Sequence, residues 1–448
     1  MAELKRSVSR FQLMLYGVGS MLGAGIYGLI GKAAGVMGSA LWAAFLLAML
    51  AALLTGLSYA SIASRYPKAA GAAYVTLRAY RWPSLAYVVG LTVLLSGLVS
   101  IATQAKVVAE NVAPLLGVAE GPSIAGTPLI ILLLAIGFLL LLAAIVFRGI
   151  TESLWANALC TFLEAGGLLL VIIVGITFWG DTNLIETPTR ADGTSGITAI
   201  LLLQGSLLTF FSFIGFEDML NVAEEVENPQ RSIPFALIGA MLIASAIYVA
   251  VSITAVSVLP WQELVDAPSP LQAVVARAAP WFPEIGFTFI TIAAVANTAL
   301  VNYVMGSRML YGMSRQGMLP EALGSVHGRR RTPHVAIALM LAVVIALQFA
   351  GDITQLASAT VLLLLLVFTV VNIGLAILKR RDGRIEGSFD VPLAVPVLGA
   401  LVCLCMMAGQ ATQEDMMGPL IALGLVATIG LLYIVSGKRN AELVEATS

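Results

Sequence analysis

The stretch Gly23-Ala24-Gly25-Ile26 interrupts an apolar helical pattern near the start of the chain. A later apolar span is interrupted in the same way, at Phe211-Ser212-Phe213-Ile214-Gly215-Phe216-Glu217. Glycine inside a helix costs about 1 kcal/mol relative to alanine, so both clusters predict helices that unwind at these points. Unwound backbone at membrane depth is tolerated only where it is buried in protein or lines a cavity, and its free N–H and C=O groups can then bind a small polar solute.

The composition indicates an integral membrane protein. Of the 448 residues, 59% are hydrophobic and 11% are charged, whereas an average soluble domain carries about 25% charged residues. The net charge of −1 gives no reason to expect a nucleic-acid partner. Cys160, Cys403 and Cys405 fall in apolar spans without metal-ligand spacing, and His327 and His334 flank one basic loop. We therefore expect no metal, no cofactor and no catalytic triad.

A helix needs about 20 apolar residues to cross a bilayer, and the chain contains twelve candidate spans. The predicted spans are 11–31, 38–64, 84–112, 127–147, 153–179, 197–223, 233–259, 284–314, 334–350, 353–378, 392–411 and 417–436.

The distribution of basic residues predicts the orientation of these spans. With the N-terminus inside, clusters such as Arg329-Arg330-Arg331 and Lys379-Arg380-Arg381 fall in cytoplasmic loops, and the opposite side carries only Lys32, Arg190 and Arg277. This asymmetry follows the positive-inside rule. We expect a multi-pass protein of the cytoplasmic membrane with both termini in the cytoplasm.

The order of the spans predicts an internal repeat. Helices 1–5 (11–180) start inside and helices 6–10 (197–378) start outside, and an interrupted segment opens each group. This pattern is typical of an inverted repeat. We expect an all-α transmembrane protein with one transporter domain over 1–448, in which helices 1 and 6 are broken and 392–436 adds two helices. The alternative is twelve helices with two chance glycine clusters and no symmetry.

Carboxylates at membrane depth are rare and usually functional. Glu164 lies midway along the fifth span, and Glu217 follows the second break. A carboxylate removed from water holds its proton more readily, which suits a proton carrier. The alternatives are structural: a permanently protonated Glu164 bonded to a neighbouring helix, and a Glu217 that caps the broken helix. Asp218, beside Glu217, is expected to be structural.

The chemistry of the two breaks suits an amino acid. Backbone N–H groups at a helix start can hold a carboxylate, and freed carbonyls can accept hydrogen bonds from an ammonium group. Phe210 and Phe216 are expected to pack rather than bind. The predicted substrate-binding residues are Met21, Gly23, Ala24, Gly25, Ile26, Phe211, Ser212, Phe213, Ile214 and Gly215.

Further motifs accompany the two breaks in a fixed order along nearly the whole chain. They are Ser64-Arg65-Tyr66-Pro67-Lys68-Ala69-Ala70-Gly71, Glu224-Glu225-Val226-Glu227-Asn228-Pro229, Arg231-Ser232-Ile233-Pro234 and Tyr311-Gly312-Met313-Ser314-Arg315-Gln316-Gly317-Met318-Leu319-Pro320. Together with the breaks, they resemble the amino acid–polyamine–organocation (APC) superfamily, in particular its bacterial and archaeal amino acid permeases.

The resemblance implies a LeuT-type 5+5 inverted repeat that works by alternating access. It also implies that the residues matching Ala24 and Gly25 hold the substrate carboxylate, while the carbonyls matching Met21, Phe211 and Ile214 take the amine. The aromatic ring matching Phe211 would act as a gate. The acidic position matching Glu217 is linked in the family to proton-dependent or gating steps.

The chain departs from the family at Glu164. Several members carry a lysine at the matching position, where it replaces a bound sodium ion, and this chain has a carboxylate there. Glu164 could therefore carry a proton or help to bind a cation. Thr298 and Asn302 are expected neighbours of that site.

These observations favour a secondary active transporter for neutral amino acids, driven by protons, with sodium as the alternative ion. An amine, polyamine or cationic amino acid carrier and an amino acid exchanger stay open. A channel or a transporter-like nutrient receptor is a more distant alternative. We expect no enzyme, because no nucleophile–base pair or metal cluster emerges. The expected partners are the substrate, its coupling ion and the lipid bilayer.

Overall fold

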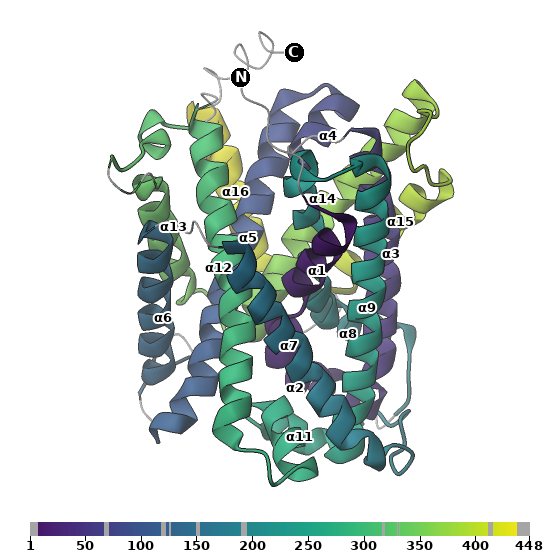
Figure 1. The fold of residues 1–448 in the computed structure, drawn as a ribbon, viewed down its shortest axis with the longest axis vertical. Helices are drawn as coiled ribbons and strands as arrows, with labels where there is room; N and C mark the ends of the chain where they lie inside the picture. The colour runs from purple at the N-terminus through teal and green to yellow at the C-terminus, as the bar shows by residue number, and fades with distance from the viewer. Residues whose placement is uncertain are drawn as a thin grey trace. The chain divides into compact units, whose positions relative to one another are not determined.

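The computed structural model describes residues 8–66, 71–117, 122–124, 127–148, 153–189, 195–315, 319–328, 330, 332–410 and 415–436. These residues are almost entirely helical (Figure 1), apart from a short antiparallel hairpin of β1 (Ser123–Ile124) and β2 (Thr127–Pro128). The chain divides into two compact units, which are described separately below.

The first unit contains both interrupted segments and comprises residues 1–71, 156–295 and 368–414. Its helices are α1 (Arg10–Met21), α2 (Ala24–Met37), η1 (Gly38–Ala40), α3 (Leu41–Arg65), most of α7 (Ser153–Gly175), η3 (Ile176–Phe178), α8 (Ala199–Phe210), η4 (Phe211–Phe213), η5 (Phe216–Glu225), α9 (Pro229–Val258), α10 (Trp261–Asp266), α11 (Pro270–Ala278) and α15 (Ala394–Gln410).

The second unit comprises residues 72–155, 296–367 and 415–448. It contains α4 (Gly71–Tyr80), α5 (Pro83–Val112), η2 (Ala113–Leu116), β1, β2, α6 (Leu129–Arg148), η6 (Glu321–Gly324), α13 (His334–Leu347) and α16 (Met417–Ser436). Two long helices, α12 (Glu284–Arg315) and α14 (Ile353–Asp382), pass from one unit to the other.

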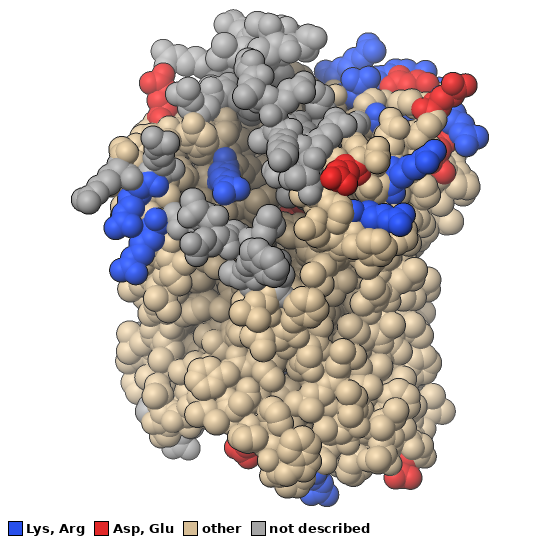
Figure 2. Space-filling view, in the orientation of Figure 1, with Lys and Arg blue, Asp and Glu red and all other residues tan. Residues whose placement is uncertain are grey.

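The lengths and hydropathies of the helices are those of a multi-pass membrane protein. In the described part of the chain, eight helical segments are long and apolar enough to cross a membrane, and the apolar stretches His334–Leu347, Ala394–Gln410 and Met417–Tyr433 are shorter. On the face drawn in Figure 2, the visible charged side chains leave a broad uncharged surface between them. The count of twelve spans and the inverted repeat stay predictions, as do the boundaries of the two repeats.

Small side chains let the helices of the first unit approach closely. α3 packs along α9, and α1 and α8 lie against this pair (Figure 1). The buried face of α3 includes Ala44, Ala48, Ala51 and Ala52. Small residues are favoured at helix contacts in membranes, because lipid tails are as apolar as leucine and association there depends on close packing.

An aromatic cluster lies beside the second interrupted segment. The rings of Phe210 and Phe216 contact Phe368 of α14, with centroid distances of 6.2 and 5.2 Å. Tyr59 of α3 meets Phe216 and Phe368 edge-on at 5.7 and 5.6 Å. The packing role predicted for Phe210 and Phe216 is confirmed by these contacts.

The second unit is built on α5, which packs against α6, α13 and α16. Lys106 of α5 is 1% exposed. Its ammonium group donates to the hydroxyl of Thr127, at 3.0 Å, and to the carbonyl of Gly351. A buried ammonium is costly unless its protons find acceptors, so Lys106 ties α5 to β2 and to the turn after α13.

Candidate functional site

The first helix is interrupted where the glycine cluster predicts it. α1 ends at Met21 and α2 begins at Ala24, so Leu22 and Gly23 lie outside both helices. The N–H of Leu22 closes α1 on the carbonyl of Val18. No side chain caps α2, since its N-cap is Gly23. The first N–H groups of α2 and the last carbonyls of α1 therefore lack helical partners at the same point of the fold.

The second interruption is a tight turn followed by a glycine with a positive φ. α8 ends at Phe210, η4 runs to Phe213, and Ile214 is extended. Gly215 has a φ of 120°, a conformation that a side chain would strain. Its N–H donates to the carboxylate of Glu217 at 2.9 Å. This contact is the one expected if Glu217 braces the broken helix.

The two interruptions lie directly against each other. A Cβ on Gly25 would collide with the backbone and side chain of Ser212. A Cβ on Gly215 would lie 2.5 Å from the carbonyl oxygen of Ser20. The hydroxyl of Ser20 also donates to Asp218 at 3.4 Å. Glycine is thus required at both points because backbone packs on backbone there.

Tyr248 of α9 joins the two interruptions. Its hydroxyl lies 2.7 Å from the carbonyl oxygen of Met21 and 2.8 Å from that of Ser212, and the side chain is fully buried. The rings of Phe213 and Phe45 hold it in place, at centroid distances of 5.2 and 5.6 Å. A single side chain therefore contacts the carbonyl ends of both broken helices.

The polar groups at the interruptions form two regions of opposite character. The carbonyls of Met21 and Ser212 lie in the last turns of helical segments, at the negative end of the helix dipole. The start of α2 presents N–H groups and the positive end. Close to it, the hydroxyl of Ser212 is buried and makes no hydrogen bond within the described structure. Such an arrangement can hold a small solute with one anionic and one cationic group.

Glu164 is fully buried on α7 and is connected to the start of α2. The hydroxyl of Tyr27, three residues after the start of α2, donates to the backbone carbonyl of Glu164 at 2.7 Å. Tyr27 is 2% exposed and lies against Phe287. The hydrogen bond from Tyr27 ties the main chain of α7 at Glu164 to the first turn of α2.

The structure brings most of the predicted substrate residues together. Met21, Gly23, Gly25 and Ile26 lie at the first interruption, and residues 211–215 form the second. The side chain of Ala24 lies outside the described residues. Thr298 and Asn302 belong to the second unit, so their role stays a prediction. Motif residues 67–70 and 316–318 also fall outside the described residues.

The carbonyls of residues 211 and 212 have different partners. The carbonyl of Phe211 accepts the N–H of Ile214 at 3.3 Å and so closes the turn of η4. The carbonyl of Ser212, one residue later, points to Tyr248 instead. Sequence reasoning missed Tyr248 altogether, since a tyrosine in an apolar span is indistinguishable from a packing residue.

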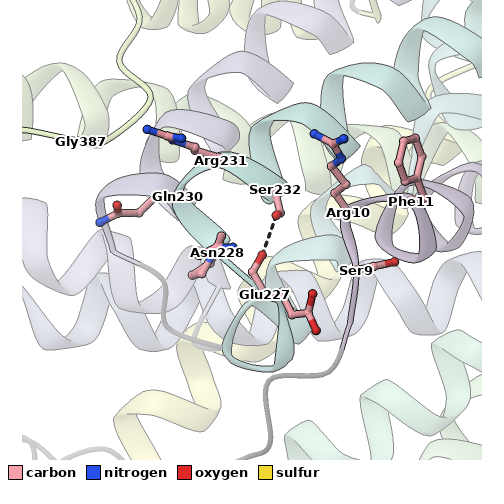
Figure 3. Close-up of a pocket in the computed structure, with 10 residues that line it drawn as sticks. Ser9, Arg10, Phe11, Glu227, Asn228, Gln230, Arg231, Ser232 and Gly387 are labelled. Carbon is pink, nitrogen blue, oxygen red and sulfur yellow. Dashed lines mark hydrogen bonds between the residues drawn. The ribbon is translucent and has the colours of Figure 1, made fainter.

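A cavity of about 900 Å³ opens at the other end of α1 (Figure 3). It lies between the start of α1, the start of α9 and the loop at Gly387. The guanidinium of Arg10 stacks on Phe11 and Phe235, 5.0 and 5.1 Å from their ring centroids. Ser232 closes the neighbouring turn by donating to the carbonyl of Glu227 at 2.6 Å. The cavity is separated from Met21 by the full length of α1.

Comparisons with known proteins agree on the class of this chain. The sequence profile of the amino acid permease family matches residues 8–431. A branched-chain amino acid permease of Bacillus subtilis, BcaP, is 28% identical over 90% of this chain and 87% of its own length. A methylthioribose transporter of the same organism is 30% identical over 90% and 88%. The vacuolar cationic amino acid transporter 2 of Arabidopsis thaliana is 30% identical over 84% of this chain and 60% of its own length.

Proposed function

Since this chain belongs to the amino acid permease family, we propose that it moves amino acids across the cytoplasmic membrane by alternating access, in symport with protons. The observation that carries this proposal is the meeting of two interrupted helices, with free N–H groups on one side and an acceptor pair on the other. Such a meeting of broken helices near the membrane midplane is how many secondary transporters hold substrate.

In this account the substrate carboxylate binds at the start of α2, next to the hydroxyl of Ser212. The ammonium group binds the carbonyls of Met21 and Ser212. The amino acid backbone is thus recognised mainly by main-chain groups, which are common to all side-chain types. The ring of Phe211 is the proposed gate, and its side chain is 5% exposed.

Glu164 is the proposed proton carrier. Glu164 is fully buried, and a carboxylate at membrane depth is usually functional. The bond from Tyr27 of α2 to the main-chain carbonyl of Glu164 links α7 to α2, which begins at the proposed substrate site. Protonation can therefore change together with the position of α2. Glu217 is the second candidate, although its contact with Gly215 favours a bracing role.

Two alternatives concern the same site. A cationic amino acid or polyamine would need a further negative group, which Glu164 or Glu217 could supply, and similar proteins include a cationic amino acid transporter. A sodium ion could take the place of the proton, and an exchanger would need no coupling ion.

A binding screen and an uptake assay test the proposal together. The purified protein is heated with each amino acid and with common amines, with and without sodium, because a bound ligand raises the unfolding temperature. Ligands that stabilise it are then tested for uptake into proteoliposomes with an inward proton gradient. We expect stabilisation by α-amino acids and sodium-independent accumulation. No stabilisation by any amino acid, or accumulation that needs sodium, would contradict the proposal.

A further inference from the structure

The contact between Tyr248 and the two interruptions is chemically incomplete. A tyrosine hydroxyl carries one proton, so it donates one hydrogen bond at a time. Here it faces two carbonyl oxygens, those of Met21 and Ser212, at 2.7 and 2.8 Å. One of the two carbonyls therefore always lacks a donor from Tyr248.

An ammonium group fits the same position better. It carries three protons and a positive charge, so it satisfies both carbonyls at once. Met21 is the last residue of α1, and Ser212 lies in η4, the turn that follows α8, so both carbonyls lie where the partial charge of the helix dipole is negative. Tyr248 thus occupies a site with the chemistry of a protonated amine, and it satisfies that site only in part.

We propose that the hydroxyl of Tyr248 takes the place of the substrate ammonium group when the transporter is empty. This inference rests on the proposed function. Without substrate and without this hydroxyl, the buried carbonyls of Met21 and Ser212 would have no hydrogen-bond donor. Each would then cost free energy comparable to a lost hydrogen bond. The hydroxyl lowers that cost, and the empty protein can pack Gly25 against Ser212 as observed. When an amino acid enters, its ammonium displaces the hydroxyl.

The consequence concerns the transport cycle. A transporter whose empty form readily adopts the closed conformation can switch back to the other side of the membrane without substrate, and it can therefore carry out net transport. One whose empty form closes poorly can only exchange one substrate for another. Tyr248 is therefore a positioning residue that permits net transport, and the symport in the proposed function depends on it.

The test compares net uptake with exchange in Tyr248→Phe. Proteoliposomes are assayed with radioactive leucine and arginine, either empty or preloaded with the same amino acid. We expect net uptake to fall about tenfold or more, since leaving buried carbonyls unsatisfied costs about a factor of ten in population. Exchange should fall by a much smaller factor than net uptake. In the absence of amino acid, Tyr248→Phe should also unfold at a lower temperature than the wild type. A saturating concentration of amino acid should reduce this difference in unfolding temperature.

Tyr303→Phe is the matched control. Tyr303 is also fully buried, and its hydroxyl donates to a single carbonyl, that of Ile337, at 2.9 Å. This variant should lower net uptake and exchange by the same factor or leave both unchanged. Equal losses of both activities in Tyr248→Phe, or unchanged net uptake, would overturn the inference. A wild-type protein that transports none of the amino acids would instead overturn the proposed function, and the inference with it.

Discussion

A methyl group added at Gly25 should disable the site. In Gly25→Ala the new Cβ meets the Cα, Cβ and hydroxyl of Ser212, and the Cα belongs to the main chain and cannot rotate away. Overpacking of this kind costs about 1–3 kcal/mol. Because the obstacle is backbone, we expect the upper part of that range, which corresponds to roughly a hundredfold change in an equilibrium constant.

The assay measures affinity and stability side by side. Leucine and arginine binding is followed by scintillation proximity, and unfolding temperature is recorded without ligand. We expect the affinity to fall at least about tenfold. Gly137→Ala is the control, because a Cβ at Gly137 of α6 meets nothing within 4 Å. Unchanged affinity in Gly25→Ala would refute the assignment of Gly25 to the substrate site, even if the protein were less stable.

Two further predictions concern the stability of the first unit. Burial raises the pKa of Asp390, but the hydrogen bonds from Lys379 and Arg65 lower it by more. The pKa of Asp390 therefore lies below its ordinary value of 3.8. The side chain of Arg65 is 0% exposed, and Asp390→Asn should cost about 3 kcal/mol by leaving it unpaired. A carboxyl group whose pKa is lowered on folding stabilises the folded protein at every pH above its ordinary pKa. This stabilisation is lost only when the pH falls below about 4. The deficit in unfolding temperature should therefore be constant between pH 5 and 8, and a deficit that vanishes towards pH 5 would contradict this. Phe368→Ala should lower the free energy of unfolding by about 3–5 kcal/mol, because it leaves a cavity in the aromatic cluster. Phe289→Ala, at a side chain that is 64% exposed, should lower it far less in the same unfolding experiment. Equal losses would show that the cluster adds no stability.

The interruptions were predictable because glycine leaves a direct mark in an apolar sequence. The structure places the two interrupted segments in contact at Gly25 and Ser212. The number of spans was harder to predict. Helices α13 and α15 are apolar but short, and length is the criterion that separates a span from a buried helix.

The hydrogen bonds of the site could not be predicted. In η4 the chain turns within three residues, so the direction of each carbonyl depends on local geometry that composition does not encode. In that turn the carbonyl of Phe211 accepts from the N–H of Ile214, and the carbonyl of Ser212 accepts from Tyr248. Tyr248 and Tyr27 lie far along the chain from the carbonyls to which they donate, and only the packing of α9 and α2 reveals their roles.

Accumulation driven by a proton gradient tests the central claim most directly. Proteoliposomes with Glu164→Gln are given an inward proton gradient and the amino acid that the wild type accumulates, and exchange is measured in parallel to show that the protein is folded. Glu217→Gln, measured in the same way, separates the two carboxylates. The account predicts that Glu164→Gln exchanges substrate but does not accumulate it, and that its uptake no longer depends on external pH. Accumulation equal to that of the wild type would contradict the account.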